Sequence, residues 1–183
     1  GLRHYPADSH ILAWLEAKGI AFDIVTDEDL HNEGAALLAP YRVLLTGSHP
    51  EYHTTETLDA LTQFRDGGGR LMYLGGNGFY WRIACVPELP GMFELRRAEG
   101  GIRAWDAEPG EYHHQLDGAL GGLWRRNGRP PQHLVGVGFT AQGNFVGSNY
   151  RVKPEARSSR AGWILAGLTE ETFGGHGLSG HGA

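Results

Sequence analysis

Cysteine, long apolar runs and basic clusters are the features that this sequence lacks. The single cysteine, Cys85, excludes an internal disulfide framework and fits a reducing compartment, so we expect a cytoplasmic protein. No apolar run approaches the roughly 20 residues that a membrane helix requires, and no signal peptide is visible. The formal net charge of -5, without a basic cluster, argues against nucleic-acid binding. We therefore expect neither a membrane nor a nucleic acid as a partner.

What the chain does contain is typical of a folded domain. Of its 183 residues, 40% are hydrophobic and 20% are charged, which is enough to form a core. Its 29 glycines are about twice the average usage, and they cluster where apolar runs give way to loops. The start at Gly1 and a tail up to Ala183 that completes no element indicate a fragment of a longer protein.

Strand and helix patterns alternate through the first half of the chain. One helix is expected from Asp8 or Ser9 up to Gly19, and another from Thr54 or Thr55 up to Gly67. Apolar runs predict strands at residues 21–25, 42–46 and 70–74, with an acidic turn at 26–30 and a short helix at 34–38. This alternation predicts a three-layer α/β fold with a doubly wound, mostly parallel sheet of at least three strands.

The second half follows a less regular pattern. Short strands are expected at residues 92–97, 102–107, 134–139 and 162–168, and a helical stretch at 120–126. Glycine, proline and charged turns separate these stretches, and no Pro/Ser linker marks a second domain. We therefore predict a single α/β domain over residues 1–183, in which 1–90 form a βαβ core and 91–183 an irregular, β-rich elaboration.

The loop from Thr46 to Thr54 follows a predicted strand and precedes a predicted helix, so it lies at the carboxyl end of that strand. Open α/β sheets bind their ligands at this edge. His49 and Glu51 stand two residues apart in an extended segment, so their side chains leave the backbone on the same side. Pro50 restricts the backbone between them. An imidazole and a carboxylate held in this way are typical of a metal site or an acid/base pair.

Other polar residues have ordinary structural explanations. His53 is expected to cap the following helix or to orient the loop, and Tyr52 to pack or to support a ligand from behind. His113 and His114 look like a metal pair but fit a surface turn better. The remaining residues of this kind are His176 and His181 in a glycine-rich tail, and Asp27, Glu28 and Asp29 in an acidic turn typical of a helix start.

Several stretches of this sequence match one known family. They are Ala13–Gly19, Asp23–His31, Gly47–His53, Tyr73–Trp81, Leu120–Arg126, Gly128–Pro131 and Val135–Phe139. Together they resemble the C-terminal region of the large subunit of N,N-dimethylformamidase and its relatives. The resemblance spans nearly the whole chain, and the His-Pro-Glu-Tyr-His run after a strand is specific.

The resemblance implies a fold similar to that of class I glutamine amidotransferases and the hydrolysis of small N-substituted formamides to formate and an amine. It also implies a mononuclear iron held by Tyr, His and Glu, of which the His and Glu fall on His49 and Glu51. The tyrosine ligand lies upstream, outside this chain, and neither Tyr5 nor Tyr52 is at the matching place. Asn77 falls where the family has a polar active-site Asn, and a further family carboxylate would lie beyond the end of the sequence.

The chemistry that the resemblance implies is coherent. Phenolate, imidazole and carboxylate donors suit Fe(III) and leave open positions for water and substrate. A Lewis-acidic metal polarises the amide carbonyl and lowers the pKa of bound water. Asn77 would then hydrogen-bond the developing oxyanion, and Phe79, Tyr80 and Trp81 would either wall a small apolar pocket or serve as core or subunit-interface residues. Cys85 lies beyond the elbow where a glutamine amidotransferase has its nucleophile, so thiolate chemistry is disfavoured.

These observations leave two hypotheses. The first is an iron-dependent formamidase, in which this chain joins the rest of the large subunit and a small subunit in an oligomer and acts on a small amide substrate. With only two ligands in this chain, we expect the fragment alone to bind metal weakly. The second is a non-catalytic, glutamine-amidotransferase-like module for assembly or carbohydrate binding in a larger protein. The iron content of the intact polypeptide distinguishes the two.

Overall fold

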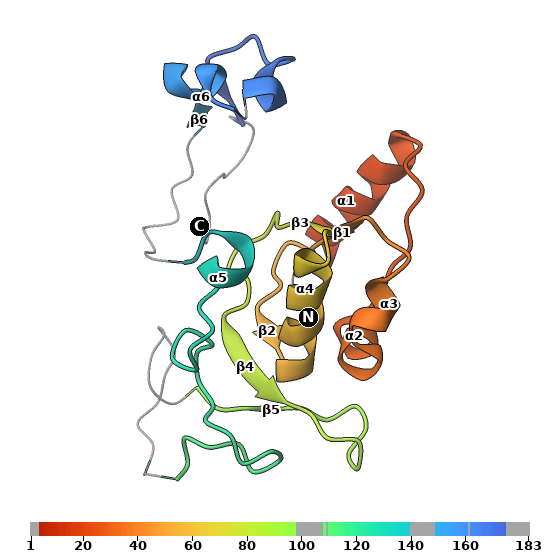
Figure 1. Cartoon of the computed structure of the whole chain (residues 1–183), viewed down its shortest axis with the longest axis vertical. Helices are drawn as coiled ribbons and strands as arrows, with labels where there is room; N and C mark the ends of the chain where they lie inside the picture. Colours follow the sequence, from red (N-terminus) through yellow and green to blue (C-terminus); the bar gives the residue numbers. More distant parts are fainter. Residues whose placement is uncertain (1–3, 98–107, 109, 140–148, 161, 175–183) are drawn as a thin grey trace. The chain divides into compact units, whose positions relative to one another are not determined.

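The computed structural model describes residues 4–97, 108, 110–139, 149–160 and 162–174 (Figure 1). Two compact units make up the chain, residues 1–139 and residues 140–183. Residue 90, where the sequence predicts a change from a βαβ core to an irregular elaboration, lies inside the first unit. The candidate site residues His49, Glu51 and Asn77 all belong to the first unit as well.

The first helix, α1 (Tyr5–Ala17), begins before the expected start at Asp8 or Ser9. Pro6 explains the earlier start, because proline already has the backbone angle of a helix and needs no hydrogen bond in the first turn. The residues expected to cap the helix therefore lie inside it. The predicted end is confirmed, since Gly19 follows the last turn with a φ of 64°, a conformation that favours glycine.

The segment that follows α1 has no regular structure, so the strand predicted at 21–25 is wrong. An apolar pattern forms a strand only where a neighbouring strand completes its ladder, and no strand in the described part of the chain pairs with this segment. Ile24 is exposed. Asp23 instead accepts a hydrogen bond from the Tyr41 hydroxyl at 2.8 Å, a contact between side chains rather than between backbones.

The acidic turn predicted at 26–30 is the start of a helix, α2 (Asp27–Glu33). Thr26 and Asp29 form a capping box, in which each side chain accepts the backbone N–H of the other residue. This reciprocal pair satisfies donors that the first turn would otherwise leave unbonded. The short helix expected next is confirmed as α3 (Ala35–Leu38).

Two of the strands predicted in the first half of the chain are confirmed. They pair in parallel and are β1 (Val43–Leu45) and β3 (Arg70–Met72). Leu44 and Leu71 lie opposite each other and pack against the core. The alternate residues Val43 and Met72 point to the other face of the ladder, where each is 47% exposed. In the described part of the chain this parallel ladder has two strands, whereas the sequence predicts at least three.

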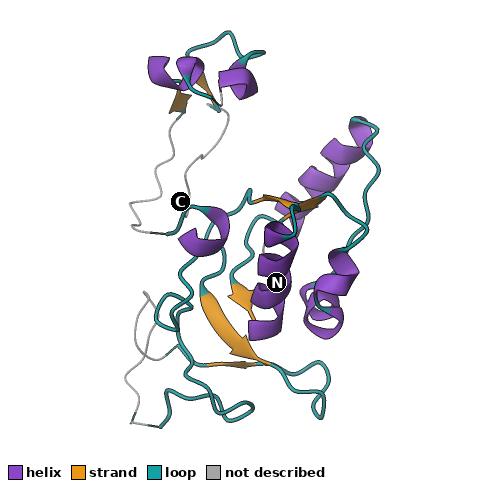
Figure 2. Cartoon of the chain, viewed as in Figure 1, coloured by secondary structure: helices purple, strands orange, loops and turns teal. Residues whose placement is uncertain are grey.

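Helix α4 (Thr55–Asp66) lies in the connection from β1 to β3, as predicted. Thr54 begins it, because its hydroxyl accepts the backbone N–H of Thr57 at 3.2 Å, and Gly67 ends it. Helices α2 and α3 lie beside α4 (Figures 1 and 2). The core between these elements includes Leu30, Leu38, Leu58, Leu61, Phe64, Phe79 and Trp124. Burial of each leucine contributes about 2 kcal/mol.

A second small sheet follows the loops at the ends of β1 and β3. Its strands are β2 (Tyr52–His53), β4 (Trp81–Ala84) and β5 (Glu94–Leu95), with β4 in the middle. β2 pairs with β4 in parallel, and β5 pairs with β4 in the antiparallel sense. The strand expected at 92–97 is thus confirmed as β5. The turn that follows β3 leads directly into β4.

Residues 110–139 are mostly loops and turns (Figure 2). The helix predicted at 120–126 is wrong, because Leu123 forms an isolated antiparallel bridge with Trp81. Leu123 and Trp124 are both buried. Their apolar character reflects this packing against β4 rather than the face of a helix.

A strand at 134–139 is also wrong, because a short helix, α5 (Gln132–Val135), occupies its beginning. Pro131 precedes the first residue of this helix, and its fixed φ suits a helix start. Gly136 ends the helix at a φ of 79°, which glycine adopts without strain. The proline and glycine therefore outweigh the apolar pattern between them.

The described residues of the second unit form short elements only. In chain order they are β6 (Tyr150–Arg151), α6 (Pro154–Ser158), the 3₁₀ helix η1 (Gly162–Leu165) and β7 (Thr172–Phe173), and β6 pairs with β7 in the antiparallel sense. The strand predicted at 162–168 is wrong, because η1 occupies its beginning. Trp163 in η1 is 76% exposed. The strand predicted at 102–107 lies outside the described residues. Among the helices that the structure describes, none is long and apolar enough to cross a membrane.

Candidate functional site

The loop after β1 and the loop after β3 meet at the carboxyl ends of the two parallel strands. Their backbones are joined directly, since Gly76 N–H donates to the Ser48 carbonyl at 3.0 Å and Phe79 N–H donates to the Pro50 carbonyl at 2.7 Å. This is the edge at which open α/β sheets bind ligands. The loop that carries the two predicted metal ligands is therefore held by the backbone of its neighbour.

Glycine at position 75 permits the close approach of the two loops. A Cβ atom on Gly75 would lie 2.6 Å from the Ser48 carbonyl oxygen and 2.8 Å from Pro50 Cδ. The Ser48 carbonyl is already bonded to Gly76, so it cannot move away without breaking that hydrogen bond. Any larger residue at position 75 would force the loops apart.

His49 lies against the N-terminal end of α1. Its ring stacks on the ring of His4, with centroids 3.8 Å apart and planes inclined by 20°. Asp8, in the first turn of α1, accepts a hydrogen bond from the Ser48 backbone N–H at 2.7 Å. The start of α1 thus contacts both the imidazole of His49 and the backbone beside it.

The side chain of Glu51 has different neighbours. Its charge acts on the hydroxyl of Tyr52, which accepts a hydrogen bond from Arg97. The Arg97 guanidinium lies 5.8 Å from the Tyr52 ring centroid and 5.1 Å from that of Trp81. Burial, and then the Glu51 charge, raises the pKa of Tyr52, so this phenol keeps its proton near neutral pH. Tyr52 is half-buried beside the predicted ligand, and its role as a support for Glu51 stays a prediction.

His53 is buried between the loop and α4. Its Nε2 atom donates to the Pro50 carbonyl oxygen at 2.9 Å, and its ring stacks on Phe79 with centroids 4.9 Å apart. Burial lowers the pKa of His53, so the ring is neutral near pH 7. Of the two roles expected for His53, the contacts support orienting the loop. The helix cap is Thr54.

Asn77 lies in the turn between β3 and β4 and adopts a left-handed φ of 50°. Asparagine adopts this conformation more readily than other residues with a side chain, apart from a few polar ones. The next residue, Gly78, donates its N–H to the Tyr73 hydroxyl at 2.9 Å. Because this turn belongs to the loop bonded to Ser48 and Pro50, the structure brings the backbone of Asn77 to the same strand ends as His49 and Glu51. Its catalytic role stays a prediction.

The donor types of the loop fit a metal, but their number is short of a complete site. His49 offers an imidazole and Glu51 a carboxylate, both of which iron accepts. Within the described residues, no three His, Cys, Asp or Glu side chains form a group that could hold a metal ion. The buried hydroxyl of Ser48 has no hydrogen-bond partner among those residues, so the loop retains an unmet polar group. A metal at this loop needs at least one further ligand.

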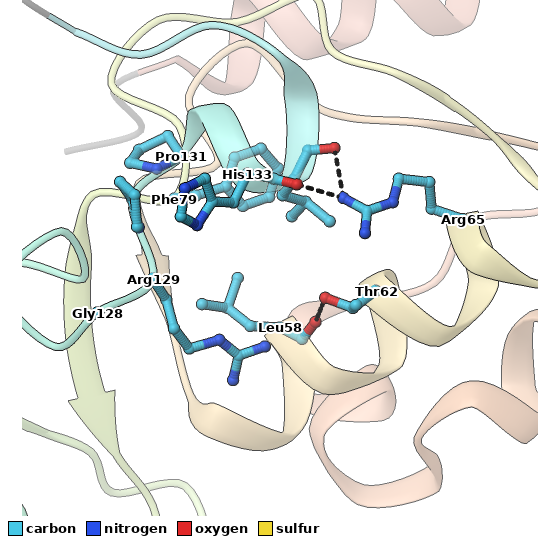
Figure 3. Close-up of a pocket in the computed structure, with 10 residues that line it drawn as sticks. Leu58, Thr62, Arg65, Phe79, Gly128, Arg129, Pro131 and His133 are labelled. Carbon is cyan, nitrogen blue, oxygen red and sulfur yellow. Dashed lines mark hydrogen bonds between the residues drawn. The ribbon is translucent and has the colours of Figure 1, made fainter.

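The aromatic run after Asn77 belongs to the core. Phe79 and Trp81 are buried, and Tyr80 packs edge-on against Trp81 with centroids 5.2 Å apart. Phe79 also lines a cavity of about 180 Å³ between α4 and the segment that leads into α5 (Figure 3). Arg65 closes one side of this cavity by donating to the backbone carbonyls of residues 133 and 134. A core position, one of the expected alternatives, is thus confirmed for Phe79 and Trp81.

A buried charged cluster that the sequence did not predict surrounds His114. Its Nδ1 atom accepts a hydrogen bond from Arg82 in β4 at 2.5 Å, and Arg82 also pairs with Asp117. Burial, and then the Arg82 charge, lowers the pKa of His114. Arg82 and His114 are 32 positions apart, so no local spacing marks them. The surface turn expected here holds for the exposed His113 but not for the buried His114.

The predictions for Cys85 and for the acidic residues 27–29 can also be compared with the structure. Cys85 is half-buried, and burial raises the pKa of its thiol, which makes it a poor nucleophile at neutral pH, as expected. The acidic residues 27–29 form the first turn of α2, where negative charge is favourable, as expected. His176 and His181 lie outside the described residues.

A family model and two named proteins are similar to this chain. A family model described as N,N-dimethylformamidase beta subunit-like, C-terminal matches residues 1–183. Over 180 residues the chain is 44% identical to the N,N-dimethylformamidase beta subunit of Alcaligenes sp and 43% identical to that of Paracoccus aminophilus. Each match covers 97% of this chain and 23% of the relative.

These matches confirm the family that the sequence motifs indicated. The relatives are named beta subunits, so the designation of a large subunit stays a prediction. The chain spans about a quarter of the length of these relatives, and it corresponds to a C-terminal region. The chain belongs to the family described as N,N-dimethylformamidase beta subunit-like, C-terminal.

Proposed function

We propose that this chain is part of an iron-dependent amide hydrolase that cleaves small N-substituted formamides, such as N,N-dimethylformamide, to formate and an amine. One observation carries the proposal. The loop after β1 holds His49 and Glu51 at the end of a parallel strand, in a chain whose relatives are N,N-dimethylformamidase subunits. The proposal includes a glutamine-amidotransferase-like architecture for the domain.

His49 and Glu51 would supply two ligands of a mononuclear iron, and a tyrosine elsewhere in the longer polypeptide would supply a third. Bound as Fe(III), the iron would polarise the amide carbonyl and lower the pKa of a coordinated water. The residues of this chain hold the ligands in place. Tyr52 would orient the Glu51 carboxylate, because its phenol lies close enough for the Glu51 charge to raise its pKa, and ligand carboxylates commonly depend on hydrogen bonds from neighbouring groups.

Asn77 would act on the substrate. Its side-chain amide is a neutral hydrogen-bond donor on the loop that is bonded to the ligand loop. A donor fixed near the reacting carbonyl stabilises the negative charge that develops on the oxygen, and such donors contribute about 3 kcal/mol in other amide hydrolases. The turn geometry limits the choice at this position, because Asn tolerates the left-handed backbone.

The complete enzyme would contain the rest of the large subunit, a small subunit and an oligomeric arrangement of both. The relatives are named as subunits, and this chain covers 23% of each. The outer face of the β1–β3 ladder supports further protein contacts, because Val43 and Met72 are half-exposed although parallel strands are usually covered on both faces.

The test compares the full-length wild-type protein with its His49→Ala and Glu51→Ala variants. Iron per chain is measured by elemental analysis, and activity by formate release from N,N-dimethylformamide. We expect iron in the wild type and a loss of activity on the order of 100-fold or more in each variant, because a metal ligand cannot be replaced by a methyl group. His10→Ala, an exposed histidine in α1, is the matched control and should keep full activity.

Wild-type protein that binds no transition metal and releases no formate would contradict the proposal. The non-catalytic, glutamine-amidotransferase-like module would then be the better explanation. Full activity in Glu51→Ala with loss in His49→Ala would contradict the ligand role of Glu51 alone.

A further inference from the structure

The carbonyl oxygen of Pro50, which lies between the two proposed ligands, accepts two hydrogen bonds. Phe79 N–H donates at 2.7 Å, and His53 Nε2 lies at 2.9 Å. A carbonyl oxygen can only accept, so Nε2 of His53 carries the proton. Both lone pairs of this oxygen are therefore occupied, one by the backbone of the neighbouring loop and one by a side chain.

The ring of His53 is itself held by its surroundings. It stacks on Phe79 with centroids 4.9 Å apart, and its Nδ1 lies 3.4 Å from the Thr57 hydroxyl in the first turn of α4. The backbone carbonyl of His53 accepts the indole N–H of Trp124 at 3.1 Å. The donor that reaches Pro50 is thus fixed by a helix and by the core.

The peptide between Pro50 and Glu51 is held at both of its polar atoms. Its oxygen accepts the two hydrogen bonds described above, and its N–H, which belongs to Glu51, donates to the His49 carbonyl at 2.8 Å. A planar peptide fixed at both atoms cannot rotate about its flanking bonds. Its plane sets the direction in which the Glu51 side chain leaves the backbone, and the closed turn sets the spacing to His49.

We propose that His53 is a positioning residue for the two ligands: its hydrogen bond to Pro50 fixes the peptide that directs His49 and Glu51. The consequence for iron rests on the proposed function, whereas the effect on the loop does not. His53 is not itself a ligand, because its Nε2 is engaged by Pro50 and its ring is buried. Nor does it begin α4, since Thr54 caps that helix.

Two substitutions in the full-length protein separate the hydrogen bond from the packing. His53→Gln keeps an N–H that reaches the Pro50 carbonyl, and His53→Leu fills similar space without a donor. His31→Leu is the matched control, because His31 is a half-buried histidine that contacts Thr54 at the start of α4, and none of its described contacts reaches residues 47–53. The readouts are hydrogen exchange of the amides of residues 47–53, iron affinity with the EPR line shape, and kcat with KM for N,N-dimethylformamide.

In His53→Leu we expect amide exchange in the loop to rise by about tenfold or more. Iron affinity should fall by about 10- to 100-fold with an altered EPR signal, as for other residues that orient metal ligands. The loss of activity should appear in kcat rather than in KM. His53→Gln and His31→Leu should stay within about threefold of the wild type in loop exchange and in iron affinity.

Loop exchange in His53→Leu equal to that of the wild type overturns the inference, whatever the iron content. Faster exchange with unchanged iron affinity and EPR signal overturns the link to the ligands. Wild-type protein without iron contradicts the proposed function instead, and the exchange measurement still decides whether His53 fixes the loop. Should His53→Leu fail to fold, His53→Gln decides alone, because a tenfold change in its loop exchange would contradict the role assigned to the Nε2–H bond.

Discussion

Two buried histidines of the first unit, His53 and His114, hold loops in surroundings that differ in charge. His53 is 2% exposed and contacts a carbonyl oxygen, a hydroxyl group and an aromatic ring. His114 is 1% exposed and contacts the Arg82 guanidinium, with Asp117 3.7 Å away. One imidazole therefore has neutral contacts, and the other belongs to a charged cluster.

This difference in charge indicates which interactions stabilise each region. Burial lowers the pKa of both rings, so each is neutral near pH 7. His114 accepts at Nδ1, which places its proton on Nε2, and this atom has no hydrogen-bond partner among the described residues. Charges taken out of water must be paired, and losing one partner is costly. Around His114, loss of a charged partner or a fall in pH should therefore lower the free energy of unfolding. Around His53, a substitution should mainly change the geometry of one loop.

Removing Arg82 should have the largest effect on stability. Arg82→Met leaves the Asp117 carboxylate and the His114 ring without their common donor, and buried polar groups that lose a partner are destabilising. We expect the free energy of unfolding to fall by about 3 kcal/mol, measured by urea denaturation. The exposed Arg125 provides the control, and Arg125→Met should change it by less than about 0.5 kcal/mol. Equal values for the two variants would show that the cluster adds no net stability.

Lowering the pH should reduce the free energy of unfolding through His114, by less than the removal of Arg82 does. The folded pKa of His114 lies below its ordinary value of 6.5, so the unfolded chain takes up the proton first as the pH falls. The stability that the neutral His114 ring contributes is therefore present above pH 6.5 and is lost as the pH falls below it. Between about pH 7 and pH 5, His114→Asn, which keeps an acceptor for Arg82 but cannot titrate, should remove roughly 1 kcal/mol of the fall in unfolding free energy.

The other charged groups that face His114 are Asp117, Glu94 and Arg96. Burial raises the pKa of Asp117 and of Glu94, but their hydrogen bonds outweigh it and leave both values lowered, so neither carboxylate titrates in this range. His53 shares the direction of the effect, so a residual slope should remain in the variant. Denaturation curves that keep the full wild-type slope in His114→Asn would contradict the assignment.

A further effect, no larger than that of acid, is expected at Thr57, beside the His53 ring. Its hydroxyl lies 3.4 Å from His53 Nδ1 and donates to the Thr54 carbonyl at 3.0 Å. Thr57→Val keeps the shape and should cost about 1 kcal/mol, with loop exchange raised by about threefold. Thr62→Val is the control, because that hydroxyl bonds only within α4 among its described contacts. A cost at Thr57 larger than at Arg82 would reverse the comparison.

The elements that the sequence predicted correctly are those with local signals. Thr54 and Gly67 mark the ends of α4, and short apolar runs mark β1 and β3. Two of the incorrect predictions depended on partners far along the chain. The run 21–25 has no neighbouring strand in the described structure, and Leu123 is apolar because it packs beside Trp81 rather than along a helix.

Features of the candidate site with local sequence signals could likewise be predicted, and features without them could not. The position of the His49 loop could be predicted because a strand directly precedes it. Its attachment to the next loop could not, because hydrogen bonds between backbones leave little trace in residue type, apart from the glycine at position 75. The cluster of Arg82, His114 and Asp117 gave no signal, since a lone arginine in a strand has many explanations.

The left-handed backbone at Asn77 and Phe79 has a consequence for natural variation. Turn geometry alone would let glycine replace Asn77, because both residues accept its φ of 50°. A catalytic role for the side-chain amide at position 77 would instead permit asparagine only. Phe79 carries a cost of roughly 1 kcal/mol at its φ of 56°, so a large ring there reflects selection for the core. The substitutions tolerated at these two neighbouring positions thus distinguish selection for catalysis from selection for packing.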